Sequence, residues 1–338
     1  MKFKKSLIVL SILLVVAIIA LPLINKMNRP SLTEKKDFAV KDTENIDSIF
    51  LSNRSGKYVL LRKQDDDKWT VNNLFNAAPD KIERLLKTIR TIEAKNPVSK
   101  AGQQQVVNSI ATDGIKVEIY QKGKKTITYY VGGSTSDEMG TFMYIDGSTI
   151  PFVVHIPGFG GYLTSRYTVS PIDWRDKAIF DTPIDKFKSV SVTYPDSANK
   201  SFEIVRGEGN VFAVKQNGVV APNTNQEYAK LYAAQFASIT FETYLNGYSR
   251  NYTDSLREAT PKCIITVNRI DGSTATLRVF YKPITSDTKS IYDNDGNLLV
   301  YVSDNYYALI DGNPELITVQ DYLFRHIFKR YNDFVSPN

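Results

Sequence analysis

The sequence predicts an α+β protein in which an N-terminal transmembrane helix is followed by two tandem related units, each a mainly antiparallel β-sheet with one long helix. Three observations support this fold class: an uncharged apolar run near the N-terminus, short segments in which apolar and polar residues alternate, and a weak repeat of those segments along the chain. We place a cytoplasmic tail and anchor in residues 1–30, the first unit in 31–172 and the second in 173–338.

The amino-acid composition indicates a folded protein. The chain has 338 residues, of which 42% are hydrophobic and 23% charged, and these values are typical of a folded protein rather than a disordered or low-complexity one. The length suggests about two domains. The single cysteine excludes an intramolecular disulfide framework and a zinc site built from several cysteines.

A membrane anchor is predicted from residues 6–24, which carry no charged side chain. As a helix that rises about 1.5 Å per residue, this run is about 28 Å long, close to the thickness of the hydrocarbon core. The alternative is a cleaved signal peptide, whose apolar region usually covers about 7–15 residues and precedes a small-x-small cleavage site. The run is longer than that, and Ile18 lies two positions before Ala20, so we expect an uncleaved anchor that binds the membrane.

The distribution of charge predicts the orientation in the membrane. Of the 42 basic residues, five lie in the first thirty positions, where there is no acidic residue, and the rest nearly balance the 36 acidic residues. This argues against nucleic acid as a partner, because nucleic-acid-binding proteins concentrate bases on the recognising domain. Lys2, Lys4 and Lys5 precede the apolar run, whereas Lys26 and Arg29 follow it. Since the more basic side stays in the cytoplasm, we expect a single-pass protein of the cell inner membrane with its C-terminal body in the periplasm.

The first unit opens with three expected strands, 46–52, 57–63 and 68–71, in which apolar and polar residues alternate. In the following segment, 79–95, apolar residues recur at three- and four-residue spacing, which predicts a long helix with one face on a sheet. The bases of this helix are expected to face water or another surface. They are Lys81, Arg84, Lys87 and Arg90.

The same order recurs in the second unit. Alternating segments at 188–194, 201–206 and 211–215 precede a helix expected over 226–245. The spacing that separates Trp69 from Phe212 also separates Ala78-Pro79 from Ala221-Pro222. The constant spacing indicates an internal duplication.

Strands continue the repeat after a shorter helical stretch in each copy. Residues 116–133 match 264–281, and each segment is two alternating strands joined by a turn that contains glycine. Two further strands are expected at 141–145 and 151–156, matched by 298–302 and 306–310, before a final helix over 315–331.

No motif for catalysis or for cofactor binding emerges. His155 lies in an alternating strand and His326 borders an apolar helix face, so we interpret both as structural. Cys263 opens a strand in which the adjacent Lys262 points to the opposite face, and this indicates a buried, unreactive thiol. We therefore expect no catalytic residue, no metal site and no cofactor.

The acidic segment 293–304 raises a calcium alternative. Oxygen-bearing side chains lie at alternate positions from Asp293, and Asp304 is the twelfth residue. The sixth position of an EF-hand loop requires glycine, however, and here it is Leu298. Asp295-Gly296 is typical of a hairpin turn, so we favour a turn and leave calcium binding open.

The segment 154–176 is not explained by the repeat, because the matching place in the second copy is an amphipathic helix. Three glycines within 158–161 permit tight turns and a close approach of the backbone. One interpretation is an interaction loop, since Tyr, Trp and Arg are enriched at interface hot spots. Its partner-binding residues would be Tyr162, Arg166, Trp174 and Arg175. The alternative is a connector whose aromatic side chains pack between the two units.

The chain resembles an uncharacterised family of bacterial single-pass envelope proteins that is known only as a domain of unknown function. The resemblance covers nearly the whole chain. It rests on the N-terminal apolar run, on KWTVNN and APDKIERLLKTIRTI, and on HIPGFGGYLTSRY with DWRDKAIF. It implies an association with ABC-type transporter components, including those that resemble gliding-motility transporters, and it implies no catalytic residue.

Two functions are therefore carried forward. The first is a membrane-anchored extracytoplasmic accessory or scaffold protein, associated with an ABC-type transporter and without catalytic activity. The alternative is an envelope hydrolase or glycan-binding module, in which aromatic side chains form a stacking surface and unrecognised carboxylates act as catalysts.

Overall fold

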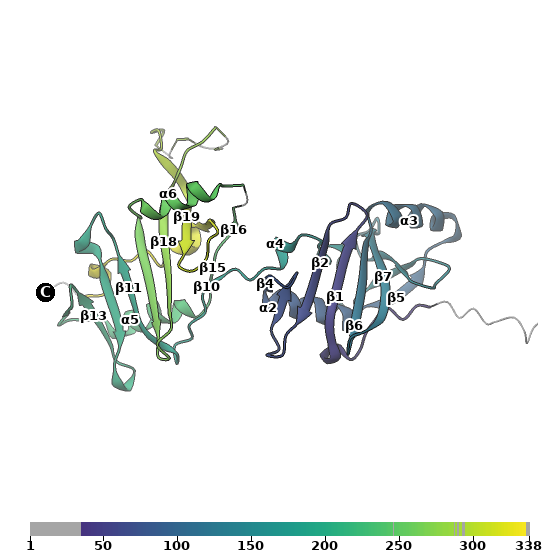
Figure 1. The fold of residues 1–338 in the computed structure, drawn as a ribbon, viewed down its shortest axis with the longest axis horizontal. Coiled ribbons are helices and arrows are strands. Elements are labelled where there is room, and N and C mark those ends of the chain that lie inside the picture. Colours follow the sequence, from purple (N-terminus) through teal and green to yellow (C-terminus); the bar gives the residue numbers. More distant parts are fainter. Residues whose placement is uncertain (1–34, 246, 287, 289–290, 293–294, 336–338) are drawn as a thin grey trace, which may run out of the picture. The chain divides into compact units, whose positions relative to one another are not determined.

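The computed structural model describes residues 35–335 apart from 246, 287, 289–290 and 293–294. The chain divides into two compact units, Met1–Arg175 (unit 1) and Asp176–Asn338 (unit 2). Each unit is built on one sheet of nine antiparallel strands (Figure 1).

The described residues of unit 1 form nine strands and three helices. Its strands are β1 (Ile46–Asn53), β2 (Tyr58–Lys63), β3 (Trp69–Val71), β4 (Phe75–Asn76), β5 (Glu93–Pro97), β6 (Ile115–Gln121), β7 (Lys124–Ser134), β8 (Thr141–Ile145) and β9 (Phe152–His155). Its helices are α2 (Pro79–Thr91), α3 (Lys100–Asp113) and α4 (Pro171–Trp174), with short 3-10 turns at Thr43–Asn45 and Thr164–Arg166. The strand order in the sheet is β4-β3-β2-β1-β6-β7-β8-β9-β5.

Both faces of the unit 1 sheet are covered where β7 and β8 lie. Tyr129 and Met143 belong to the main core, together with Leu85 of α2. The next residue along β7, Tyr130, packs instead with Ile110 of α3 in a separate cluster. Because successive strand residues point to opposite faces, α2 covers one face of the sheet and α3 covers the other.

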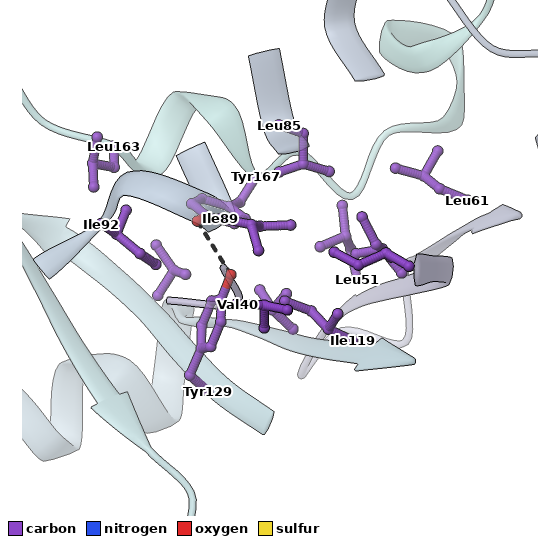
Figure 2. Packing of buried hydrophobic residues seen from close by; sticks show 14 of the residues in the cluster. Val40, Leu51, Leu61, Leu85, Ile89, Ile92, Ile119, Tyr129, Leu163 and Tyr167 are labelled. Carbon is purple, nitrogen blue, oxygen red and sulfur yellow. Dashed lines mark hydrogen bonds between the residues drawn. The ribbon is translucent and has the colours of Figure 1, made fainter. Parts of the chain in front are cut away.

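Helix α2 begins at Pro79, where proline is favoured because the first helical residue needs no intrahelical N–H bond. Its buried apolar residues Ile82, Leu85 and Ile89 form the stripe that the sequence spacing predicts. Figure 2 shows Leu85 and Ile89 of this stripe above the sheet residues Leu51 and Tyr129. The helix is therefore held by its apolar face, and its bases lie on the rest of its surface.

Unit 2 contains a second large sheet and a small one. The strands of the large sheet are β11 (Phe187–Thr193), β12 (Phe202–Arg206), β13 (Phe212–Gln216), β14 (Val219–Val220), β16 (Thr243–Tyr244), β17 (Cys263–Arg269), β18 (Thr274–Pro283), β19 (Tyr301–Ile310) and β20 (Ile317–Gln320). Strands β10 (Ala178–Phe180) and β15 (Ile239–Thr240) pair separately. The helices are α5 (Gln226–Ala234), α6 (Arg250–Glu258) and α7 (Asp321–Phe324).

The two large sheets have the same order of strands. The order in unit 2 is β14-β13-β12-β11-β17-β18-β19-β20-β16, which repeats the unit 1 order element by element. Trp69 opens β3 and Phe212 opens the corresponding β13. Helix α6 packs Tyr252 and Leu256 against Phe280 of the sheet, as α3 does in unit 1.

The predicted fold class is wrong in its helices, because both units are mainly antiparallel sheet with few helices. The helix expected over 226–245 ends at Ala234, and the β-branched residues Ile239 and Thr243 lie in strands β15 and β16 instead. Packing against neighbouring strands outweighs the helical spacing of the apolar residues in this segment.

The final helix predicted over 315–331 is also wrong. Ile317, Thr318 and Val319 are β-branched and buried, and they form β20, which pairs with β19. Strand β19 is continuous where two strands, 298–302 and 306–310, were expected. Strand β20 therefore has the place of β9, and the helix that follows it, α7, has only four residues.

The described residues contain no helix that is long and apolar enough to cross a membrane. The apolar run 6–24, from which the transmembrane helix is predicted, lies outside the described residues. The fold class is accordingly corrected to two units dominated by antiparallel sheet.

The buried pair Tyr129 and Tyr167 predicts a loss of stability at high pH. Their hydroxyl oxygens are 3.3 Å apart (Figure 2), and burial raises the pKa of Tyr167 to about 12 and that of Tyr129 well above its usual value. The unfolded chain releases these protons near pH 10, whereas the folded protein retains them. Each retained proton lowers the free energy of unfolding by about 1.4 kcal/mol per pH unit above pH 10.

We therefore expect Tyr167→Phe to lose stability less steeply than the wild type between about pH 10 and pH 12, in urea unfolding followed by circular dichroism. Tyr58→Phe is the matched control, because the side chain of Tyr58 is 53% exposed and its removal should leave the wild-type slope unchanged. Equal slopes for the wild type and Tyr167→Phe would contradict this account.

Candidate functional site

The chain that leaves β9 folds back onto unit 1. Leu163, Tyr167 and Trp174 are buried in the main core of unit 1. The backbone N–H of Leu163 donates to Thr141 Oγ1 at 2.6 Å, and Trp174 Nε1 donates to the Thr168 carbonyl at 2.9 Å. We call residues 156–175 the return segment. Its aromatic residues Tyr167 and Trp174 belong to the core of unit 1 and hold the segment in place.

Glycine permits the turn that opens the return segment. Gly158 has φ +77° and Gly161 has φ +146°, values that other residues rarely adopt. A Cβ on Gly161 would also lie 3.1 Å from the Phe159 ring. The turn therefore brings Phe159 onto the surface of the unit, where its side chain is 37% exposed.

Three of the four predicted partner-binding residues surround one pocket of about 350 Å³. Tyr162, Arg166 and Trp174 line it together with residues of α2. Tyr162 is 41% exposed, whereas Trp174 is buried, so they contribute in different ways. The fourth residue, Arg175, does not line this pocket. Its guanidinium lies 3.7 Å from the centre of the Phe75 ring.

Arg166 is held in place from two sides. Its Nη1 donates to Thr88 Oγ1 of α2 at 2.9 Å, and its guanidinium lies 4.5 Å from the centre of the Phe159 ring. The pKa of Arg166 is lowered, first by burial and then by the positive charge of Arg84. Arg166 thus presents a fixed cation beside a second one, and its geometry suits a ligand with negative charge.

A neighbouring pocket of about 750 Å³ shares Arg84, Phe159 and Arg166 with the first. We call the two together the basic groove. It is lined by six basic side chains, Lys41, Lys81, Arg84, Lys87, Arg90 and Arg166. Only two acidic side chains line it, Glu93 and Asp173.

Sequence reasoning missed the contribution of α2 and of Phe159 to this site. The bases of α2 were expected to face water or another surface, but nothing in the pattern indicated that Arg166 lies beside them. The link is tertiary, since Arg166 contacts Thr88 across 78 positions of the chain. The basic spacing on α2 is the only signal that could have pointed to it.

The other titratable residues considered from the sequence lie elsewhere. His155 is half-buried on β9, and His326 is exposed after α7. Cys263 is buried, and burial raises the pKa of its thiol to about 12, so the thiol is protonated at neutral pH. Among the described residues, no cluster of three or more histidine, cysteine, aspartate or glutamate side chains could hold a metal ion.

The acidic segment 293–304 is only partly within the described residues, because Asp293 and Asn294 lie outside them. The described part is a turn. Tyr292 and Leu298 form an antiparallel bridge, and Gly296 has φ +83°. Asp304 lies exposed on β19.

The different burial of the candidate residues leads to different mutational effects. Trp174→Ala should lower the free energy of unfolding by about 3–5 kcal/mol, because it removes a buried aromatic side chain from the core. Tyr162→Ala should change it by no more than about 0.5 kcal/mol, since the side chain is largely exposed. Urea unfolding followed by circular dichroism measures both. A large loss for Tyr162→Ala would show that this side chain supports the fold.

Comparison with known families gives one match. The family described as "Domain of unknown function (DUF4340)" matches residues 69–258, from β3 of unit 1 to α6 of unit 2. No curated protein and no solved structure matches the chain. The expected resemblance to an uncharacterised domain family is confirmed at that level. With more than half of its length matched, the chain belongs to the DUF4340 family.

Proposed function

We propose that this protein is a non-enzymatic accessory or scaffold protein of the cell envelope that binds a protein partner through the basic groove of unit 1. The observation that carries the proposal is the arrangement around Arg166. An exposed tyrosine and a fixed arginine lie beside a buried tryptophan, and such residues dominate the binding energy of protein interfaces.

The rigidity of the site supports a binding role. Arg166 is restrained by Thr88 and by Phe159, and the backbone around it is held by the buried residues Leu163 and Tyr167. A side chain that is already ordered loses less conformational entropy when a partner binds. The groove therefore offers contacts that need little rearrangement.

The place of action is part of the proposal. The uncharged run 6–24 and the basic residues before it support attachment to the inner membrane with both folded units in the periplasm. The resemblance to envelope proteins supports an ABC-type transporter subunit as the partner. Neither point rests on the geometry of the groove.

A glycan-binding module is the second candidate, and one feature of unit 2 favours it. Tyr281 and Tyr301 stack with ring centres 4.8 Å apart, and their side chains are 44% and 45% exposed. Exposed aromatic faces of this kind can stack on sugar rings. Two stacked rings offer a smaller binding surface than the basic groove, so we place this candidate second.

Co-purification tests the first proposal. The full chain, tagged at its C-terminus, is extracted from its native membranes in mild detergent, and the recovered proteins are identified. We expect a transporter subunit to be recovered with the wild type and with the control Arg54→Ala, an exposed arginine on the turn after β1. Recovery should fall at least about tenfold for Arg166→Ala, since truncation of a hot-spot residue weakens binding by about 2 kcal/mol or more.

The same preparations give the contradicting outcomes. Thermal unfolding of Arg166→Ala should stay close to that of the wild type, because Thr88 Oγ1 keeps its bond to the Arg84 carbonyl. A monodisperse protein with no subunit recovered would contradict the accessory role. Binding on a glycan array that is lost in Tyr281→Ala would favour the second candidate instead.

A further inference from the structure

The basic groove carries positive charge that the described part of the chain leaves largely uncompensated. Arg84 has an ion pair with Asp80, but the distance is 3.7 Å and both side chains are exposed, so this pair is weak. Lys41 Nζ donates a hydrogen bond to the Arg90 carbonyl at 3.2 Å, and this bond leaves the positive charge of the ammonium group in place. Within the described residues, no carboxylate forms an ion pair with Lys81, Lys87, Arg90 or Arg166.

The two acidic residues of the groove offset only part of this charge, because six basic side chains line it. Asp173 accepts a hydrogen bond from Thr168 Oγ1 at 2.9 Å, and Lys81 bonds to the Asp173 backbone carbonyl rather than to its carboxylate. Glu93 lies exposed at the start of β5. The groove is therefore a cationic surface on a chain whose remaining charges nearly balance.

The bases form a row rather than a single cluster. Lys81, Arg84, Lys87 and Arg90 follow one another at three-residue intervals along α2, and each lines the groove. At about 1.5 Å and about 100° per residue, the row spans about 14 Å and turns by about 60° at each step, so Lys81 and Arg90 point to opposite sides of the helix. One small anion can contact only a part of such a row, whereas an extended chain that carries several carboxylates can contact several neighbouring bases at once.

Apolar residues lie between the charges. Leu85 and Trp174 line one part of the groove and Ile156 lines the other, with Phe159 common to both parts. A polyphosphate or a nucleic-acid backbone has no apolar side chains that could pack against these residues. In an extended peptide with acidic and apolar side chains in alternation, successive side chains point in opposite directions, so the acidic ones can face the bases of α2 while the apolar ones face Ile156 and Phe159 of the return segment.

We propose that the basic groove binds an extended acidic segment of the protein partner, with one carboxylate held between Arg84 and Arg166 and an apolar side chain packed against Phe159. This inference rests on the proposed function and names the chemistry of the partner. Arg84 and Arg166 line both pockets, so their like charges repel each other in the free protein, and a carboxylate between them offsets that repulsion. Binding is accordingly sensitive to salt.

The test uses the full chain in detergent and a fluorescein-labelled ten-residue peptide of alternating glutamate and leucine. Binding is measured by fluorescence anisotropy at about 50 mM and about 300 mM salt. We expect the double variant Arg84→Glu/Arg166→Glu to weaken binding at least about tenfold. The matched control Arg54→Glu/Arg62→Glu makes the same change of charge at two exposed arginines of unit 1 outside the groove, and it should bind within about twofold of the wild type.

Two probes separate an acidic segment from other anions. A peptide with glutamine in place of glutamate should bind at least about tenfold more weakly, and inorganic phosphate or vesicles that contain phosphatidylglycerol should not displace the acidic peptide at matched charge. Equal binding of the two peptides, equal effects of the two double variants, or displacement by phosphate or vesicles would overturn the inference. Unfolding curves of all variants confirm that each is folded before its affinity is compared.

Failure of this inference is distinguishable from failure of the proposed function. If the transporter subunit co-purifies equally with the wild type and with Arg84→Glu/Arg166→Glu, the groove is not the acidic-segment site and the inference is overturned, although an accessory role stands. If the peptide binds as expected while no subunit is recovered with any variant, the inference is supported and the accessory role is contradicted.

Discussion

The packing of the return segment against the sheet and α2 is the constraint on which the site in unit 1 depends. Leu163, Tyr167 and Trp174 bury their side chains in the same core as the apolar stripe of α2. The carbonyl of Trp174 also accepts the backbone N–H of Ala78, directly before α2 begins. Because both walls of the basic groove are held by this one core, Arg166 and the bases of α2 keep a fixed separation.

The position that the return segment occupies in unit 1 is filled by different residues in unit 2. After β20, unit 2 fills the corresponding space with Phe334, which packs on Phe202 and Tyr232, and no glycine turn precedes it. Helix α5 carries a single base, Lys230, whereas α2 carries four. The shared strand order therefore maintains two similar scaffolds, and the row of bases on α2 has no counterpart on α5.

Alternation along the chain located individual strands well, because a strand with one buried face requires it. The segment 46–52 lies in β1, and β2 covers all but the first residue of the segment 57–63. The helix predictions over 226–245 and 315–331 failed because apolar residues three and four positions apart also occur where a short helix meets a strand. In these segments the β-branched residues, together with pairing at the sheet edge, favour strands over helices. Arg166 was singled out by residue type, but its neighbours on α2 depend on tertiary contacts that no local pattern encodes.

Native-state hydrogen exchange of the full chain tests most directly whether the return segment is part of the folded core. The reporting amides are those of Leu163, bonded to Thr141, and of Ala78, bonded to Trp174. If the segment is held as described, both exchange as slowly as the interior sheet amide of Ile119, through global unfolding of the unit. Exchange of Leu163 and Ala78 orders of magnitude faster than that of Ile119 would show that the segment opens independently, and it would contradict a preformed groove.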